Sequence, residues 1–219
     1  MLKRLFCLLL ALATALPVWA ADPVYEVEII AFTRTVDPAM TGGEDGSLSA
    51  HRPDLDSGFS LDMLGGLPID NLKLGNVVAR LKADQNYQVL LHQAWRQPVG
   101  TSATAPWLQL SSGSVTDESG NSQPEFAGLI KLYRNPHLFM DADLLLRRLG
   151  MSKPSTTSQT HYAGSADVSA AQATVEASAA PVPTLKEYPL VSSNRVMEGQ
   201  ITYFDGPMLG LLVQARPVK

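Results

Sequence analysis

Alternation between apolar and polar residues, repeated along several segments, is the feature that most limits how this chain can fold. Residues 24–32 read Val-Tyr-Glu-Val-Glu-Ile-Ile-Ala-Phe, with the apolar side chains of one face at Tyr25, Val27, Ile29 and Ala31. A period of two with β-branched residues is typical of a strand that buries one face. Similar patterns predict further strands over residues 87–97, 107–110, 127–134, 137–148, 200–204 and 209–215. The sequence therefore predicts a mostly antiparallel sheet.

The faces of two of these strands follow from the same alternation. In residues 137–148 the predicted core face carries Leu138, Met140, Ala142, Leu144 and Leu146, and the predicted solvent face carries His137, Phe139, Asp141, Asp143 and Arg147. Asn135-Pro136 forms the turn before this strand, because proline presets the second turn position. In residues 87–97 one predicted side carries Tyr87, Val89, Leu91, Gln93 and Trp95.

One helix is predicted, over residues 71–84. Its apolar positions repeat at i, i+3, i+4 and i+7, at Leu74, Val77, Val78 and Leu81. Asp70 is the expected N-cap, since its carboxylate could accept from the first free backbone N–H groups. The predicted fold class is α+β: a mostly antiparallel sheet with one principal amphipathic helix.

Composition identifies two segments that are not expected to contribute to the hydrophobic core. Residues 36–67 are rich in Gly, Asp, Ser and Pro, which predicts a long loop. Residues 151–184 are dominated by Ser, Thr, Ala and Pro, with too few large apolar residues to offset the entropy of ordering. We therefore expect a single domain over residues 21–219 with a disordered, low-complexity insertion at about residues 151–184.

The first twenty residues have the composition of a cleavable secretory signal peptide. Lys3 and Arg4 precede an apolar run over residues 5–15, and Val18-Trp19-Ala20 places small residues where cleavage after Ala20 needs them. No segment predicts a membrane-spanning helix. The expected mature chain has no thiol, because Cys7 is the only cysteine, and its charge is 15 − 21 = −6. This net negative charge argues against nucleic-acid binding.

Catalytic and metal-binding patterns are scarce, so we expect no enzyme activity, no cofactor and no metal. The histidines are scattered, and the loop over residues 51–56 offers two carboxylates where Ca²⁺ usually takes six to eight oxygen ligands. The alternative is a periplasmic glycan hydrolase using Asp141 and Asp143. Two positions apart on a strand, they stand roughly 6.5–7 Å from each other, which is compatible with a glycosidase carboxylate pair.

Aromatic residues beside polar ones predict a sugar-binding surface, because sugar rings stack on aromatic faces and their hydroxyls pair with polar groups. The candidate ligand-binding residues of this kind are Trp95, Arg96, Trp107, Tyr133, Arg134, Tyr203 and Asp205. Trp95 has the same strand parity as Val89 and Leu91, which favours a place in the core over a place on the surface.

The segment Tyr87–Pro98, Tyr-Gln-Val-Leu-Leu-His-Gln-Ala-Trp-Arg-Gln-Pro, resembles the CsiV family of periplasmic peptidoglycan-binding proteins of gammaproteobacteria. Further resembling segments follow in the same order, at residues 25–32, 128–134, 137–144, 203–207 and 210–213. The family tends to have His-Tyr-Leu-Asp-His-Pro and a preceding Arg-Arg pair. This chain has Thr-Tyr-Phe-Asp-Gly-Pro at residues 202–207 and Asn194-Arg195, which adds Arg195 to the candidate ligand-binding residues.

The resemblance implies a function in the cell wall. It implies a periplasmic adaptor that binds peptidoglycan and supports peptidoglycan assembly, and hence cell shape. The implied protein partner is an outer-membrane lipoprotein that activates a class A penicillin-binding protein.

Overall fold

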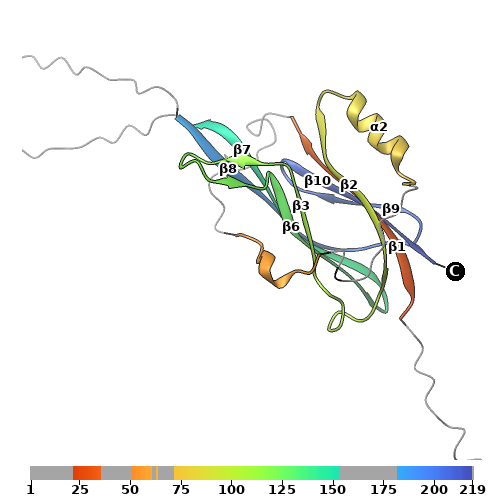
Figure 1. Ribbon diagram of the computed structural model, residues 1–219. Coiled ribbons are helices and arrows are strands. Elements are labelled where there is room, and N and C mark those ends of the chain that lie inside the picture. Colours follow the sequence, from red (N-terminus) through yellow and green to blue (C-terminus); the bar gives the residue numbers. More distant parts are fainter. Residues whose placement is uncertain (1–21, 36–50, 61–62, 64–71, 153–181, 219) are drawn as a thin grey trace, which may run out of the picture.

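Two four-stranded sheets form the body of the protein, in a computed structural model that describes residues 22–35, 51–60, 63, 72–152 and 182–218 (Figure 1). The first sheet has the order β2-β1-β10-β9, with strands Tyr87–Pro98, Val24–Arg34, Leu209–Pro217 and Ile201–Asp205. The second has the order β3-β6-β7-β8, with strands Leu108–Ser112, Phe126–Asn135, His137–Ser152 and Val182–Arg195. The remaining elements are helix α2 (Gly75–Ala83), the 3-10 turn η2 (Leu55–Ser57) and a small ribbon of β4 (Val115–Thr116) and β5 (Ser122–Gln123).

The two sheets pack face to face around one hydrophobic core. Trp95 and Phe204 of the first sheet and Phe126 and Met140 of the second are fully buried members of this core. All neighbouring strands within the sheets pair antiparallel, which confirms a mostly antiparallel architecture. The expectation of a single sheet was wrong, because alternation marks the buried face of a strand and leaves open which element covers it.

Strand β1 is buried on both faces, and this determines where the helix lies. Val27 and Ile29 contribute to the core between the sheets. Ile30 and Phe32, on the opposite face, form a second apolar cluster with Leu74 and Val78. Helix α2 therefore covers the face of the first sheet that points away from the second sheet, as Figure 1 shows.

The helix is shorter than the predicted 71–84. It begins at Gly75, and Leu74 occupies the N-cap position without a side-chain cap. The backbone N–H groups of Lys73 and Leu74 instead donate to the carboxylate of Glu28 on β1. Glu28, which is distant in the sequence, thus accepts from backbone N–H groups at the helix start, as Asp70 was expected to do. Asp70 itself lies outside the described residues.

Strand β2 contains a bulge that changes its faces. Val89 pairs with Phe32 and Leu91 pairs with Ala31, so Leu90 is an extra residue between them. Tyr87 and Val89 accordingly pack with the helix cluster, whereas Leu91 and Trp95 pack against the core between the sheets. The prediction that all of these side chains share one side of the strand was wrong, because a bulge shifts the alternation by one residue.

The predicted core face of β7 is confirmed: Leu138, Met140, Ala142, Leu144 and Leu146 are all buried. Arg147 is a correction to the predicted solvent face. Its side chain is buried, and its Nε lies 3.1 Å from Oε1 of Glu187, which is also buried. A buried guanidinium is tolerated here because it is paired with a carboxylate.

The strands flanking the predicted insertion are longer than expected. Strand β7 continues to Ser152 and β8 begins at Val182, each within two residues of the predicted bounds at about 151 and 184. Residues 153–181 lie outside the described part of the chain, as do the predicted signal peptide and most of the 36–67 loop. Within the described residues no helix has the length and apolar character needed to cross a membrane.

Candidate functional site

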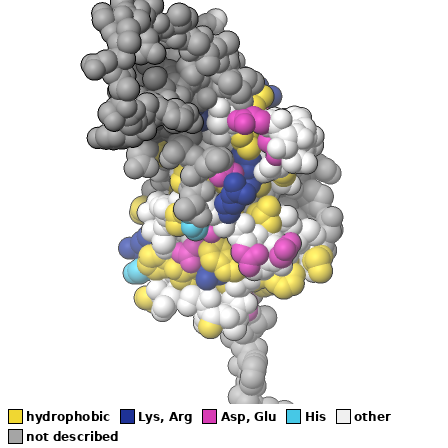
Figure 2. Space-filling model, turned by 90° about the vertical axis from the view of Figure 1, so that its left-hand side faces the viewer, with side chains coloured by type: hydrophobic (Ala, Val, Ile, Leu, Met, Phe, Trp, Pro, Cys, Tyr) yellow, Lys and Arg dark blue, Asp and Glu magenta, His cyan; other side chains and the backbone are white. Residues whose placement is uncertain are grey.

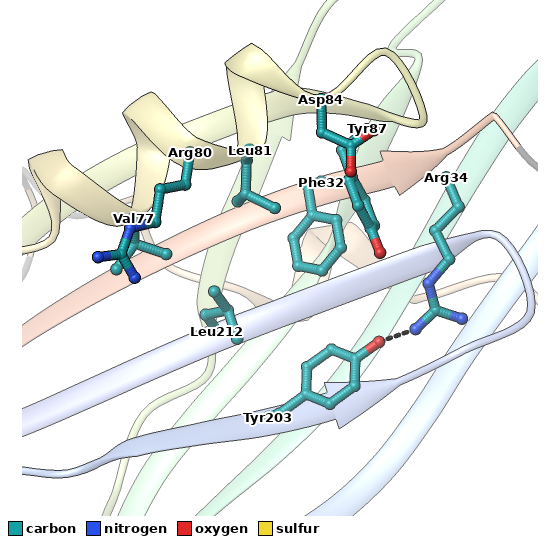
Figure 3. Close-up of a pocket in the computed structure, with 9 residues that line it drawn as sticks. All are labelled: Phe32, Arg34, Val77, Arg80, Leu81, Asp84, Tyr87, Tyr203 and Leu212. Atoms are coloured by element: carbon teal, nitrogen blue, oxygen red, sulfur yellow. Dashed lines mark hydrogen bonds between the residues drawn. The ribbon is translucent and has the colours of Figure 1, made fainter.

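A pocket of about 460 Å³ lies between α2 and the first sheet (Figure 3). Its lining comes from the helix and from strands β1, β2, β9 and β10, and comprises Phe32, Arg34, Val77, Arg80, Leu81, Asp84, Tyr87, Tyr203 and Leu212. We call it the aromatic pocket. It exists because the short helix covers only part of the sheet face that carries Phe32.

Three aromatic rings form one wall of the aromatic pocket. Tyr203 stacks on Phe32 with ring centroids 6.2 Å apart and an interplanar angle of 15°. Tyr87 meets Phe32 edge to face at 5.6 Å and 71°. Tyr203 is 40% exposed, so part of its ring remains open to a ligand. Such a ring offers the flat apolar surface on which sugar C–H faces stack.

A hydrogen-bonded triad holds the polar edge of this wall. Arg34 donates to the hydroxyl of Tyr203 and, at 2.5 Å, to Oδ1 of Asp205. The Tyr203 hydroxyl donates to the same Asp205 oxygen at 2.6 Å. The three side chains come from β1 and β9, which are joined through β10. The network fixes the orientation of the Tyr203 ring.

The triad also sets the charge states at the aromatic pocket. Burial and the hydrogen bond to Asp205 raise the pKa of Tyr203 to about 12. The hydrogen bond from Tyr203, together with Arg34, holds the pKa of Asp205 below its usual range despite partial burial. Near neutral pH the edge therefore carries a neutral phenol between a guanidinium and a carboxylate, which is suited to binding hydroxyl groups.

The rim of the aromatic pocket is formed by α2. Arg80 of the helix and Asp84, its C-cap residue, line it, opposite Tyr203 (Figure 3). Among the described residues no carboxylate lies within ion-pair distance of Arg80. The rim therefore offers a guanidinium to an anionic part of a ligand.

Of the residues at the aromatic pocket and its triad, Tyr203 and Asp205 were candidates from the sequence, whereas Phe32, Arg34 and Arg80 were not. Phe32 and Arg34 lie at the end of β1, on the face it shares with Glu28 and the helix cluster. The available signal was parity along β1, since Phe32 and Arg34 alternate in phase with Glu28.

A second pocket, of about 250 Å³, lies where the β6–β7 turn meets the link between β8 and β9. It is lined by Arg134, His137, Leu138, Arg195, Val196, Met197, Glu198 and Gln200. We call it the arginine pocket. Two residues of the predicted site, Arg134 and Arg195, are brought together here from different strands.

The two guanidinium groups of the arginine pocket differ in how many partners they contact among the described residues. Arg134 donates to the hydroxyl of Tyr25 at 3.2 Å and lies 3.8 Å from Glu198. Arg195 donates to Nδ1 of His137 at 3.2 Å. Glu198 accepts a 2.5 Å hydrogen bond from Tyr25. Burial, and then this bond to Glu198, raise the pKa of Tyr25.

Trp95 is a correction to the predicted site. Its side chain is 0% exposed, and its indole N–H donates to Oε1 of Gln97 at 2.6 Å. It pairs with Val27 across the strands of the first sheet and faces the second sheet. A fully buried indole cannot stack on a sugar, so Trp95 belongs to the core.

Trp107 and Tyr133 lie together on the outer face of the second sheet. Nζ of Lys131 is 4.7 Å from the ring centroid of Trp107 and 5.5 Å from that of Tyr133. Tyr133 also stacks on Phe139, with centroids 5.8 Å apart. Figure 2 shows that acidic, basic and hydrophobic side chains are interspersed on this side of the molecule. Because none of these residues lines the aromatic pocket or the arginine pocket, they form a third surface.

Arg96 stands apart from the other predicted site residues. It projects from β2, and its exposed guanidinium contacts Glu26 at 3.3 Å. It lines neither the aromatic pocket nor the arginine pocket.

Asp141 and Asp143 contact separate partners on the outer face of the second sheet. Asp141 accepts from Ser193 at 2.6 Å and from Tyr133 at 3.2 Å. Asp143 lies 2.7 Å from Nε2 of His51. Among the described residues no group of three His, Cys, Asp or Glu side chains is arranged to hold a metal ion.

Comparison with known proteins identifies a family. Residues 56–218 match the model of a family described as "Peptidoglycan-binding protein, CsiV". Neither the curated proteins nor the solved structures contain a match. The matched range includes every lining residue of the arginine pocket and, of the aromatic pocket, all but Phe32 and Arg34.

Proposed function

Because the chain belongs to the CsiV family of peptidoglycan-binding proteins, we propose that it binds peptidoglycan and that the glycan strand lies in the aromatic pocket. The observation that carries this assignment is the half-exposed ring of Tyr203, fixed between Phe32 and the Arg34–Asp205 pair. An ordered aromatic face beside charged hydrogen-bonding groups is the surface that sugar recognition needs. The volume of about 460 Å³ is within the range of small-ligand sites.

Sedimentation with purified sacculi tests this proposal. We expect the wild-type protein to be retained above a periplasmic control protein. Tyr203→Ala is expected to weaken retention roughly tenfold, since an aromatic stacking contact contributes about 0.5–1.5 kcal/mol beyond the area it buries. Tyr203→Phe keeps the stacking ring and is expected to lose less.

Tyr133→Ala is the matched comparison, because Tyr133 is also a partly exposed tyrosine stacked on a phenylalanine. We expect this variant to bind like the wild type. If Tyr133→Ala lost retention while Tyr203→Ala kept it, the glycan site would belong on the outer face of the second sheet. No retention of the wild type would reject the binding function itself.

The proposed location is the periplasm, reached through a signal peptide over residues 1–20. The composition of these residues supports export, and a peptidoglycan-binding family belongs to the cell envelope. Cell fractionation and amino-terminal sequencing are expected to find a periplasmic protein that begins at Ala21. An unprocessed chain in the cytosol would contradict this part of the proposal.

We further propose that the protein is an adaptor in cell-wall assembly that supports an outer-membrane lipoprotein activator of a class A penicillin-binding protein. The support for this partner is the resemblance to the family. Co-purification from detergent-solubilised envelopes is expected to recover the lipoprotein. Loss of the protein is then expected to alter cell shape.

The proposed function is non-catalytic. Asp141 and Asp143 contact partners that join neighbouring elements: Ser193 on β8 for Asp141, and His51 of the 51–60 segment for Asp143. The competing function, glycan hydrolysis by these two carboxylates, predicts release of soluble muropeptides from sacculi that Asp141→Ala abolishes. We expect no release above background from the wild-type protein.

A further inference from the structure

The arginine pocket carries more positive charge than its own residues balance. Arg134 and Arg195 bring two guanidinium groups, whereas Glu198 is the one carboxylate among the described lining residues. Glu198 receives its short hydrogen bond from Tyr25, and its distance of 3.8 Å from Arg134 is longer than a hydrogen bond. Two neighbouring cations with one partly engaged anion favour an anionic ligand.

Most N–H donors of the Arg195 guanidinium have no side-chain partner among the described residues. A guanidinium group has five N–H donors, and the one side-chain contact of Arg195 within the described residues is its bond to His137. The protein as a whole carries a net charge of −4, so this exposed cation does not belong to a generally basic surface. Its open donors lie on the same pocket as Arg134, which Tyr25 and the carbonyl of Pro136 hold in place.

The other walls indicate what accompanies the negative charge. Leu138, Val196 and Met197 give aliphatic contacts, and Gln200 adds an amide. No Phe, Tyr or Trp side chain is among the described lining residues, in contrast to the aromatic pocket. Aliphatic surface with an amide and two guanidinium groups fits a short peptide with free carboxylates better than a sugar ring.

The two pockets are connected through one short strand. Gln200, directly before β9, lines the arginine pocket, and Tyr203, in the middle of β9, lines the aromatic pocket. A polymer whose sugar chain carries short peptides could therefore contact both.

We propose that the arginine pocket binds the carboxylate groups of the peptide stems of peptidoglycan, with Arg195 and Arg134 as the carboxylate-binding residues. This inference rests on the proposed function and adds a second site to it. The aromatic pocket then binds the sugar chain, and the arginine pocket distinguishes strands that carry peptides from strands that do not.

The experiment compares three probes on the full-length protein: intact peptidoglycan fragments, glycan strands freed of their peptides by an amidase, and the released peptide stems. We expect Arg195→Gln to lower affinity for the intact fragments and the free peptides roughly tenfold, and to leave affinity for the peptide-free glycan unchanged. Arg134→Gln/Arg195→Gln is expected to abolish binding of the free peptides. Lys82→Gln, which removes an exposed cation of α2 that lines neither pocket, is the charge-matched control and is expected to bind like the wild type.

The outcomes separate the two proposals. If Arg195→Gln binds all three probes like the wild type, or weakens the peptide-free glycan equally, the inference is overturned while peptidoglycan binding stands. If the wild type binds none of the probes, the proposed function fails as well. Thermal melting of each variant identifies a folding defect. Arg195→Gln is the decisive variant because it breaks one side-chain contact, whereas Arg134→Gln also removes the bond to Tyr25.

Discussion

The backbone N–H of Leu74 donates to Oε1 of Glu28 at 2.7 Å, so a carboxylate on β1 caps the helix that covers this strand. The N–H of Lys73 donates to the other oxygen at 2.9 Å. His92 and Arg216 complete the environment of this fully buried carboxylate, at 2.9 and 3.2 Å. Glu28 therefore joins the helix, β2 and β10 at one point, and the aromatic pocket depends on the helix position that it fixes.

Replacement of Glu28 by glutamine is expected to destabilise the protein by about 2–4 kcal/mol. The amide of glutamine places an N–H₂ group against donors and removes one of the two carboxylates, Glu26 and Glu28, that balance Arg216. Urea unfolding monitored by tryptophan fluorescence measures the loss. Glu118→Gln, in an exposed turn, is the control and is expected to change stability by less than about 0.5 kcal/mol.

Stability is expected to fall on acidification, partly through Glu28. Burial alone would raise the pKa of Glu28, but the N–H of Leu74, His92, the N–H of Lys73 and Arg216 outweigh it and lower the pKa. A carboxyl with a lowered folded-state pKa stabilises the fold above its ordinary value of 4.5, and this stabilisation is lost as the pH falls through the folded-state value. Urea midpoints measured from neutral pH to about pH 3 are expected to decline less steeply in Glu28→Gln. Equal slopes in the two proteins would contradict this account.

The ionisation of Tyr203 is expected to report on the triad at the aromatic pocket. With its pKa raised to about 12, Tyr203 stays protonated near pH 10.5, where an ordinary tyrosine is more than half ionised. Asp205→Asn removes a group that raises this pKa and is expected to lower it, whereas Arg34→Gln removes a group that lowers it and is expected to raise it further. NMR of ring-labelled tyrosine, with Tyr203→Phe for assignment, measures these shifts. Movement in the opposite directions would disprove the arrangement.

Trp95 is expected to matter for stability and not for ligand binding. Trp95→Ala opens a cavity in the core between the sheets and is expected to cost about 3–5 kcal/mol. Trp95→Phe should fold with a smaller loss, since it keeps an aromatic ring. Sacculus retention of the folded Trp95→Phe protein is expected to equal that of the wild type. A selective loss of retention would return Trp95 to the ligand site.

Replacement of residues 153–181 by a two-residue Asn-Gly turn is expected to preserve the fold. Ser152 and Val182 are paired across the antiparallel β7–β8 ladder, so a tight hairpin turn can join them. Shortening the connection is expected to stabilise the protein by up to about 2 kcal/mol, because each halving of loop length saves about 0.6 kcal/mol of closure entropy. Thermal melting checks the result, and a loss of the cooperative transition would refute it.

Much of the strand pattern was predictable because alternation is a local property. The core face of β7, from Leu138 to Leu146, follows directly from it. The bulge at Leu90 was not predictable, because one extra residue leaves no mark in an apolar run. The helix start was missed for a different reason. Its cap is Glu28, which is distant in the sequence, and no local pattern around Leu74 reveals it.

In the candidate sites too, local features were predictable from the sequence, whereas contacts between distant segments were not. Tyr203 and Asp205 are near neighbours on one strand, and their aromatic and acidic character indicated a polar binding edge. Arg34 joins them only through the strand order β1-β10-β9, which the sequence does not state. Arg134 and Arg195 were each candidates, but their meeting at one pocket depends on how β6, β7 and β8 end together.

Strand β7 has 16 residues and, at about 3.3 Å per residue, is roughly 50 Å long. One end carries His137 of the arginine pocket, and the other ends at Ser152, where the described chain breaks off (Figure 1). A fluorescent reporter inserted between Ser152 and Val182 would lie at the end of β7 opposite the arginine pocket. We expect live-cell imaging of this fusion to follow the protein without the label obstructing the arginine pocket, which lies at the opposite end of β7.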